Sequence, residues 1–589
     1  MRNLKNSSIL VMVLLIGAGT LFMACGLATK RETVTADTLP RNETLYYNGL
    51  QWGTPKGNNV YGNTNNAFAE FGHRQLQFET LFTYNLLDGR LYPQIGDSFS
   101  WNDQTLTVQL NRNVRFSNRM SLTAEDVVYV FELAKKYSIG ASRYWQYLES
   151  VTADGDYTVI FQGKAPPNFN RKLMEQAISE VSITSKFYWQ MKINMGDLGS
   201  SAEDLFNFMG WDCYGTGPYK LFYYDDTKLV LIRDDDYWGK HPSRYGKLPV
   251  PKYIAHNIYR DNNDGDDAFR RGEVDVSQQF VFQIWNMWGL PIETYITQSP
   301  YYWPGVMPSL IFNTTKPGLN DKAVRKAIAM VLDYEMIRIS AMSSYSAVKQ
   351  ASMMLPVPQE QALIDLDALK PYQWEGININ GAFKLLNDAG WTVGLDGIRA
   401  KGDARLSFRV ECPYGWSDWS ASLRLVTTAT NQLGMDIKTY FPSAEEWSND
   451  RFNGDFDIIV DTPGGQGVSS PWSRAYEMMY SGYLPRVGTI NMIGNWGRYS
   501  NPRVNTLIDQ IANETNAANL KNLWTELNQI YLDEMPAIGL MYRPWVFHTV
   551  NSSVWTGYPK INDGTNVPPT ILINGYGIKG LYNLKLKGK

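Results

Sequence analysis

One stretch, residues 214–239, constrains the fold more than any other in this chain of 589 residues. A glycine-proline turn at residues 215–218 supplies backbone freedom and one restricted φ angle. Two runs of β-branched and aromatic residues follow the turn, Tyr219–Tyr224 and Lys228–Arg233, and Tyr237-Trp238 ends the stretch. This pattern predicts a β-hairpin that leads into an aromatic corner.

Short motifs between residues 78 and 128 predict a second region of strands and one helix. Asp88-Gly89 is typical of a hairpin turn, and the apolar residues of 106–110 alternate as in a half-buried strand. Thr123 precedes a helical pattern whose apolar face continues to Phe131, and threonine is a good N-cap.

The rest of the chain alternates strands with helices. Residues 253–276 are typical of a small βαβ unit, in which a glycine separates a short helix from the second strand. Asp321 is expected to cap a helix with a continuous apolar face. Strands are expected at 406–410 and 456–460, and a helix at 419–433. The sequence therefore predicts an α/β protein.

Over about residues 45–550 the chain resembles the family 5 extracellular solute-binding proteins of ABC transporters. The resemblance rests on the motifs of residues 78–128, on Gly215-Thr-Gly-Pro-Tyr219 and on Arg233-Asp-Asp-Asp-Tyr-Trp238. Two positions depart from the family pattern. Asp234 replaces the usual asparagine, and Arg119 ends a phrase that is Phe-Ser-Asp-Gly in the family.

The resemblance implies a periplasmic-binding-protein type II-like fold, with two main lobes, a hinge and one inserted lobe. It also implies a monomeric receptor that captures its ligand in an interlobe cleft and delivers it to the permease of an ABC importer. The expected segments are a signal peptide (1–24), a flexible tether (25–43), domain I in three parts (44–77, 211–308 and 537–589), domain II (78–210) and domain III (309–536).

The N-terminus has the pattern of a bacterial lipoprotein signal. Arg2 and Lys5 precede an apolar run, and Leu21-Phe-Met-Ala-Cys25 ends it, with Phe22 where leucine is usual. Cleavage before Cys25 would leave a thiol for lipid attachment, and two acyl chains give a stable anchor. We therefore expect a lipid-anchored protein at the periplasmic or extracellular face of the cytoplasmic membrane. A plain signal peptide or an uncleaved anchor is the alternative.

The composition argues against several other functions. A formal net charge of −3 gives no sign of a nucleic-acid-binding surface. The four histidines are isolated and no nucleophile, phosphate-loop or zinc motif occurs, so we expect no catalytic residue, metal or cofactor. A secreted glycan-cleaving enzyme, which needs two placed carboxylates, is a remote alternative. The acidic cluster of 261–267 fails the EF-hand spacing and is expected to cap a helix. Cys213 and Cys412 could form one disulfide.

The ligand is expected to be an oligosaccharide, with cello- or related β-linked sugars preferred. The chain has 19 tryptophans and 36 tyrosines, many of them in polar loops, where a ring can stack on a sugar while amides and carboxylates bind the hydroxyls. The candidate ligand-binding residues follow strands that would line the cleft. They are Trp52, Asn65, Gln278, Gln279, Trp285, Tyr414, Trp416, Asp418, Trp419, Gln466 and Trp472.

An oligopeptide is the alternative ligand. Peptide-binding relatives typically place an aspartate after a third-lobe strand, where it pairs with the α-amino group. The corresponding phrase here, residues 456–472, has glycines and Gln466 instead, although Asp461 could be a displaced partner. The neutral amide favours a ligand rich in hydroxyls.

We predict that Cys25→Ser yields a folded protein that is released from the membrane, because no other segment of the mature sequence is long and apolar enough to span a bilayer. Membrane fractionation with a high-salt wash measures this. A serine variant that still sediments with membranes would contradict the lipoprotein hypothesis.

Overall fold

The structure is a computed structural model that describes residues 38–51, 53–62, 73–138, 140–166, 168–374, 376–484, 491, 493–569 and 575–588. The chain divides into a short unit, Met1–Leu39, and a compact unit, Pro40–Lys589. The predicted signal peptide with Cys25, and two predicted ligand residues, Trp52 and Asn65, lie outside the described residues. Among the helices that are described, none has the length and apolar character needed to cross a membrane.

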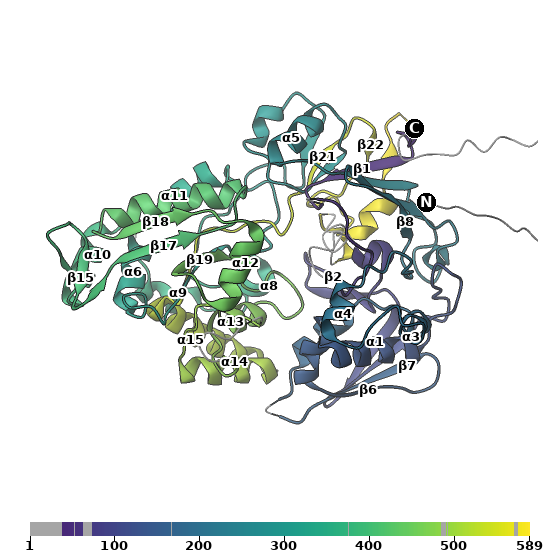
Figure 1. Ribbon diagram of the computed structural model, residues 1–589, viewed down its shortest axis with the longest axis horizontal. Helices are drawn as coiled ribbons and strands as arrows, with labels where there is room; N and C mark the ends of the chain where they lie inside the picture. Colours follow the sequence, from purple (N-terminus) through teal and green to yellow (C-terminus); the bar gives the residue numbers. More distant parts are fainter. Residues whose placement is uncertain are drawn as a thin grey trace, which may run out of the picture. The chain divides into compact units, whose positions relative to one another are not determined.

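A seven-stranded mixed sheet contains β1, near the start of the compact unit, and β21, from its C-terminal part (Figure 1). Its order is β12-β21-β11-β1-β10-β9-β8, and β1 pairs in parallel with β10 and β11. Helix α5 (Asn262–Arg270) connects β10 to β11, as the βαβ pattern predicted. The strands are β1 (Thr44–Asn48), β8 (Tyr219–Tyr224), β9 (Lys228–Arg233), β10 (Tyr253–Asn257), β11 (Val276–Ser277), β12 (Ile292–Thr294) and β21 (Thr549–Asn551).

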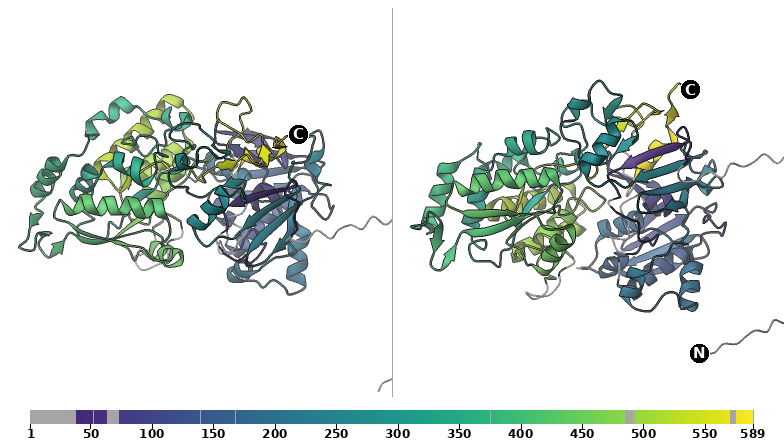
Figure 2. Two further views of the ribbon diagram at one scale, coloured as in Figure 1. Left: turned by 90° about the horizontal axis from the view of Figure 1, so that it is seen from above. Right: turned by 45° about the horizontal axis from the view of Figure 1, so that its top comes forward.

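The predicted hairpin of the opening stretch is confirmed, because β8 and β9 pair as antiparallel neighbours at one edge of this sheet. The acidic cluster also behaves as predicted, since Asp261 caps α5 by accepting a hydrogen bond from the backbone N–H of Asp264 at 3.0 Å. Strand β21 pairs with β11 in the register Val276–Val550, so segments far apart in the sequence are neighbours in this sheet. In Figure 2 the yellow C-terminal part of the chain lies beside purple and teal segments.

A four-stranded antiparallel sheet is built from residues 96–163 in the order β4-β5-β7-β6. Helix α1 packs on β6 and β7 and begins after Thr123, as predicted. Asp88-Gly89 forms the turn between β2 and β3, with Gly89 at φ +70°. The elements of this region are β2 (Phe82–Asn85), β3 (Arg90–Pro93), β4 (Gly96–Asn102), β5 (Thr105–Leu110), α1 (Ala124–Tyr137), β6 (Leu148–Ala153), β7 (Thr158–Gly163), α2 (Arg171–Glu180), α3 (Lys186–Asn194) and α4 (Ala202–Asn207).

A five-stranded sheet, in the order β18-β17-β19-β13-β20, organises residues 309–539. Its strands β17, β18 and β19 are parallel, and Asp321 caps α6 by accepting a hydrogen bond from Ala323 N–H at 2.9 Å, as predicted. The elements are β13 (Ser309–Phe312), α6 (Lys322–Val331), α10 (Ile379–Asp388), β17 (Ser407–Glu411), α11 (Ser417–Asn431), β18 (Asp436–Tyr440), α12 (Ala444–Asn453), β19 (Ile458–Asp461), α13 (Trp472–Met479), α14 (Pro502–Asn513), α15 (Ala517–Glu534) and β20 (Ala537–Gly539).

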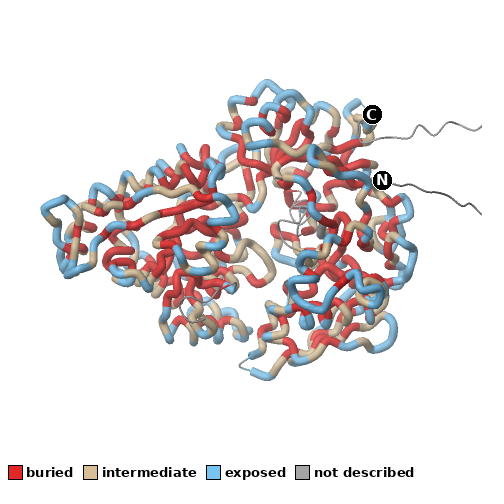
Figure 3. Tube along the Cα trace, viewed as in Figure 1, coloured by how far each residue is buried: buried red, intermediate tan, exposed pale blue. Residues whose placement is uncertain are grey.

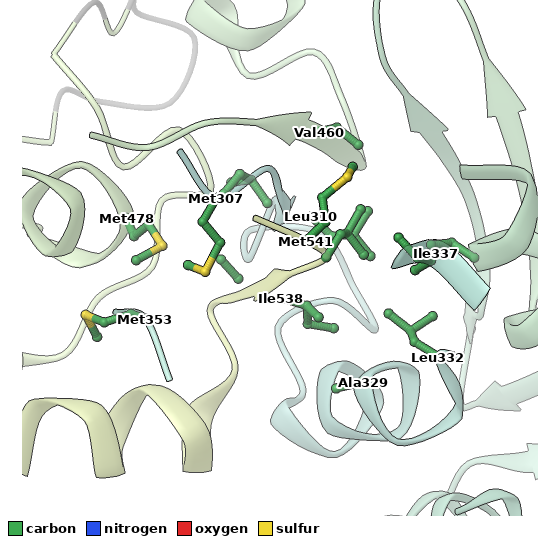
Figure 4. Close-up of a cluster of buried hydrophobic side chains, with 14 of the residues drawn as sticks. Met307, Leu310, Ala329, Leu332, Ile337, Met353, Val460, Met478, Ile538 and Met541 are labelled. Atoms are coloured by element: carbon green, nitrogen blue, oxygen red, sulfur yellow. The ribbon is translucent and has the colours of Figure 1, made fainter. Parts of the chain in front are cut away.

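Strands β13, β19 and β20 consist entirely of buried residues. Figure 3 shows that buried segments (red) lie in the interior and that exposed segments (pale blue) lie at the periphery. Apolar side chains from β13, β19 and β20 meet those of the surrounding helices in one core, of which Figure 4 shows Leu310, Val460 and Ile538. Short elements complete the fold. They are β14 (Thr392–Val393), β15 (Arg399–Lys401), β16 (Ala404–Arg405), β22 (Trp555–Thr556), β23 (Lys585–Leu586), α7 (Tyr334–Met336), α8 (Pro358–Gln361), α9 (Leu366–Leu369), and the 3₁₀ or π segments η2 (His73–Gln77), η3 (Gly140–Gln146), η4 (Trp238–Lys240), η5 (Ile284–Met287), η6 (Ile337–Ala341), η7 (Lys370–Tyr372) and η8 (Tyr576–Tyr582).

A buried carboxylate connects two of the sequence motifs. Glu79 is fully buried and accepts hydrogen bonds from the Tyr237 hydroxyl at 2.5 Å, from the Trp238 indole N–H at 2.9 Å and from the Gln94 amide. Burial raises the pKa of Glu79 to about 7. The aromatic corner of the opening stretch therefore serves to satisfy an acidic group that precedes β2.

The two departures from the family pattern contact each other. Arg119 donates two hydrogen bonds to the nearly buried carboxylate of Asp234, at 2.7 and 2.8 Å. Arg119 adopts φ +77°, a conformation that favours glycine, which is the family residue there. Each substitution therefore accounts for the other: the aspartate brings a charge that the arginine neutralises.

We predict that Arg119→Gly lowers the thermal unfolding midpoint, because it leaves Asp234 without its charge partner. Removal of one partner of such a pair costs about 1–3 kcal/mol, and the relief of the positive φ offsets part of this. Arg119→Gly combined with Asp234→Asn restores the family residues and should regain at least half of the lost stability. Calorimetry of Arg119→Gly, Asp234→Asn and the double variant measures the coupling between the two residues. Strictly additive changes in stability would show that they are not coupled.

Cys213 and Cys412 are both free and buried, so the possible disulfide between them does not form.

Candidate ligand-binding site

Two chain segments run antiparallel between the seven-stranded and five-stranded sheets. β12 pairs with β21 at one end of the two segments, and β13 pairs with β20 at the other. Between these pairs, Val306 and Arg543 exchange backbone hydrogen bonds, each of 2.9 Å. We call residues 302–312 and 537–549 the double crossing.

A cavity of about 40 Å³ lies against the double crossing. Five parts of the chain line it: the β2–β3 hairpin, the residue after β12, the double crossing, the loop after β19 and the C-terminal segment. The lining residues are Tyr84, Leu86, Tyr295, Tyr302, Trp303, Gly305, Gln466, Trp545, Val546, His548, Pro568, Pro569, Gly575 and Gly577. No aspartate, glutamate, lysine or arginine occurs among these described lining residues.

Gln466, which the sequence predicted as a ligand-binding residue, holds two walls of the cavity together. Its amide nitrogen donates to the carbonyl oxygen of Leu86 at 2.8 Å, and its amide oxygen accepts from the indole N–H of Trp303 at 3.1 Å. The amide therefore fixes the orientation of the Trp303 ring. These bonds leave it one further N–H and lone pairs for a ligand.

His548 is the polar group that sequence reasoning missed. Its side chain is 1% exposed, lines the cavity, and makes no hydrogen bond from either ring nitrogen to any described residue. Burial lowers the pKa of His548 to about 4, so the ring is neutral at physiological pH. A neutral imidazole has one donor and one acceptor. Its isolated position in the sequence offered no signal, because only the fold brings it beside Trp303.

Trp545 forms a partly exposed wall of the cavity, with 40% of its surface accessible. Its indole packs so closely on Gly465 that a Cβ atom at that glycine would lie 1.8 Å from Cζ3 of the ring. The glycines that follow β19 therefore let the backbone approach an aromatic ring, and Gly465 determines where that ring stands.

The carboxyl ends of the parallel strands β17, β18 and β19 form one edge of the five-stranded sheet, where ligands of open α/β sheets usually bind. After β17 the chain presents Trp416, whose ring lies 4.6 Å from that of Trp419 and 5.9 Å from that of Trp447. Trp416 is 42% exposed, whereas the other two indoles are buried. The cluster thus presents one indole to solvent.

The carboxylates at this edge have partners within the protein. Asp418 pairs with Arg543 of the double crossing at 2.7 Å, and Asp461 pairs with Arg451 at 3.0 Å. Asp461 also accepts from the N–H of Thr462 at 2.7 Å. Glu477 accepts from a backbone N–H at 2.7 Å, and burial raises its pKa to about 7.

The structure gathers some predicted site residues and separates others. Gln466 lines the cavity, while Tyr414, Trp416, Asp418 and Trp419 lie together at the sheet edge, which the Asp418–Arg543 ion pair connects to the double crossing. The remaining described candidates have structural contacts. Gln278 is buried after β11, and Gln279 donates to Asn262 and Asp266 of α5. Trp285 packs near Tyr301, and Trp472 donates to the carbonyl of Ile508 at 2.9 Å.

Comparisons with known proteins agree with the motifs. The profile of the family described as "Bacterial extracellular solute-binding proteins, family 5 Middle" matches residues 90–483. Among curated proteins, the chain is 22% identical over 493 residues to the "Probable peptide-binding protein YejA" of Agrobacterium fabrum, covering 77% of this chain and 78% of that protein. It is 23% identical over 374 residues to the "Oligopeptide-binding protein AppA" of Bacillus subtilis, covering 60% and 61%.

Among solved structures, an oligopeptide ABC transporter periplasmic binding protein of Thermotoga maritima, bound to mannohexaose, superimposes with a TM-score of 0.82 at 26% identity, covering 94% of this chain and 100% of that one. AppA of Bacillus subtilis in complex with a nonapeptide superimposes with a TM-score of 0.70 at 18% identity, covering 92% and 98%. These matches confirm the predicted multi-domain α/β, periplasmic-binding-protein type II-like fold, and the relatives are solute-binding receptors, as expected, rather than enzymes. The chain belongs to the family 5 extracellular solute-binding proteins, the extracytoplasmic substrate receptors of ABC importers.

Proposed function

We propose that this receptor captures an oligosaccharide, with cello- or related β-linked sugars preferred, and delivers it to the permease of an ABC importer. The observation that carries the proposal is the cavity at the double crossing, whose described lining is aromatic and neutral. Peptides bring at least one charged terminus, which a site recognises best with an opposite charge, whereas sugars bring hydroxyls and apolar ring faces.

The polar groups of the cavity suit hydroxyls. His548 and Gln466 each combine a donor with an acceptor, and neither is charged at neutral pH. A sugar hydroxyl also donates and accepts, so it can satisfy the buried imidazole, which otherwise loses the hydrogen bonds it would make in water. Trp545, which is partly exposed, supplies a ring face on which a pyranose can stack.

The cavity is large enough to hold only a small part of the ligand. A volume of about 40 Å³ is far below that of a pyranose ring, so the cavity takes a substituent while the sugar rings contact partly exposed aromatic residues around it. Trp545 lies two residues from Arg543, and Trp416 lies two residues from Asp418, so the ion pair brings both indoles into one region. We assign the ring-stacking surface to these two side chains.

An oligopeptide is the second candidate, and the names of the curated relatives favour it. Against it, Asp461 is the carboxylate that sequence reasoning identified as a possible partner for the α-amino group, and Arg451 already neutralises it. The Thermotoga maritima protein offers a precedent, because it carries an oligopeptide-binding name and holds mannohexaose.

The proposal includes the position of the receptor in the cell. We propose that Cys25 carries the lipid anchor, and that residues 25–43 act as a flexible tether between this anchor and a monomeric domain.

Titration of intrinsic tryptophan fluorescence tests the ligand class. We expect a saturable response to at least one of the cello-, xylo- and manno-oligosaccharide series and none to tri- to pentapeptides, because the described lining residues include no carboxylate for the ammonium group. Tight binding of several unrelated peptides that N-acetylation abolishes, with no response to any sugar, would overturn the assignment.

A matched pair of glycine variants tests whether Trp545 belongs to the site. Gly465→Ala should displace the indole, because the added Cβ would lie 1.8 Å from the ring, and should weaken sugar binding about tenfold or more through the lost stacking contact. Gly467→Ala is the control, since its Cβ would meet no atom within 4 Å. Calorimetric titration of both variants gives the comparison. If both variants bind the sugar with the same affinity, Trp545 is not part of the binding site.

A further inference from the structure

A second cavity, of about 320 Å³, lies in the part of the molecule that surrounds the five-stranded sheet. It shares no lining residue with the cavity at the double crossing. The ends of α6 and α15, strand β20 and the loop of residues 348–352 form its walls. A volume of this order is sufficient for a small organic molecule.

The interior of this second cavity is mostly apolar. Leu332, Met535 and Ile538 are buried and face it from α6, α15 and β20, while Val348 and Ile377 are exposed at its rim. Such walls favour an aliphatic or aromatic body over a sugar or a free ion.

One basic side chain lines the cavity among the described residues, and it is Lys349. Its ammonium group donates to the backbone carbonyls of Gln350 and Ser352 and lies 5.2 Å from the centre of the Tyr542 ring. No ion pair with a described carboxylate is recorded for it. Burial, together with the nearby guanidinium of Arg474, lowers the pKa of Lys349 to about 7. A carboxylate placed beside this amine would relieve the cost of the buried charge.

Among the described lining residues, two are acidic, and both have hydrogen-bond partners elsewhere. Asp333 accepts from the N–H of Met336 at 2.8 Å, and Glu335 binds Arg338 through two hydrogen bonds of 2.6 and 2.8 Å. Neither is therefore in place to neutralise Lys349.

A glycine leaves room for this lysine. Gly539 lies in the buried strand β20, and a Cβ atom there would lie 3.0 Å from Cε of Lys349 and 2.6 Å from Sδ of Met307. Glycine weakens a strand interior, so its presence marks a close approach. Here the close neighbours are the side chain of Met307 and the stem of Lys349.

We propose that this cavity is a second binding site, separate from the sugar site, for a small carboxylate with an apolar body, such as a medium-chain aliphatic acid. The carboxylate binds the ammonium group of Lys349, and the hydrocarbon chain lies against Leu332, Met535 and Ile538. The site is independent of the identity of the transported ligand.

Octanoate is the probe, with 1-octanol as the uncharged control, and calorimetric titration of the full mature protein is the measurement. We expect saturable octanoate binding, and binding of octanol that is about ten- to hundredfold weaker, as the loss of a charge-assisted hydrogen bond implies. Equal binding of the two probes, or no saturable octanoate binding, overturns the proposal.

Three variants locate the site. Lys349→Met should weaken octanoate binding about tenfold or more, whereas Lys349→Arg, which retains the charge, should keep most of it. Lys438→Met removes an exposed lysine of the same region and should change nothing. Unchanged binding in Lys349→Met overturns the proposal.

Two further measurements do not depend on the folding of Lys349→Met. After reductive methylation with ¹³C-formaldehyde, the Lys349 dimethylamine resonance, assigned by its absence in Lys349→Arg, should shift with octanoate at the calorimetric affinity. An excess of the oligosaccharide that binds best should not displace octanoate. Displacement by sugar, or an unperturbed resonance, would show that octanoate binds elsewhere and would overturn the proposal.

Discussion

The double crossing is the constraint on which the rest of the structure depends. The chain leaves the seven-stranded sheet after β12, enters the five-stranded sheet at β13, and returns through β20 to β21. Because the outgoing and returning segments bond to each other at both ends and at Val306–Arg543, they hold residues that are more than 200 positions apart in fixed register. The cavity exists because Trp303 and His548 belong to opposite segments of this pair.

The described residues of the candidate site carry no unpaired charge. Charged groups are abundant nearby, but Asp418 pairs with Arg543 and Asp461 pairs with Arg451, so the acids serve to hold the loops of the sheet edge. A buried ion pair contributes little net stability but holds its two partners firmly, since breaking it leaves a charge without a partner. The acids of the sheet edge are thus neutralised by their own partners, while His548 and Gln466 in the cavity are uncharged.

The pairing of a buried charge also explains the two departures from the family pattern. Asp234 would be a buried, unpaired carboxylate if Arg119 were glycine, and Arg119 accepts an unfavourable φ angle to reach it. Glu79 has no charged partner. Three neutral groups donate hydrogen bonds to it, and burial raises its pKa. In each case a buried charge is explained by partners elsewhere in the chain.

Local signals in the sequence determined the elements and the family. The hairpin Tyr219–Arg233, the N-caps Thr123 and Asp321 and the βαβ unit around α5 were predictable, because turn residues, capping side chains and apolar periodicity act within a few positions. The family motifs added the fold class and the role of a receptor. Gln466 could be proposed from the amide and glycines that follow a strand, although its site role, like those of the other predicted residues, stays a prediction.

Only the tertiary structure decided which of these residues meet. The cavity joins Tyr84, Trp303, Gln466 and His548 from four distant segments, and no local pattern encodes such contacts, because they follow from strand pairing across the whole chain. The exposure of individual tryptophans was likewise decided by the tertiary structure. Trp472, Trp419 and Trp545 all follow strands, yet the first two are buried in helices and the third is partly exposed against Gly465. Packing against neighbouring elements, and not composition, sets their exposure.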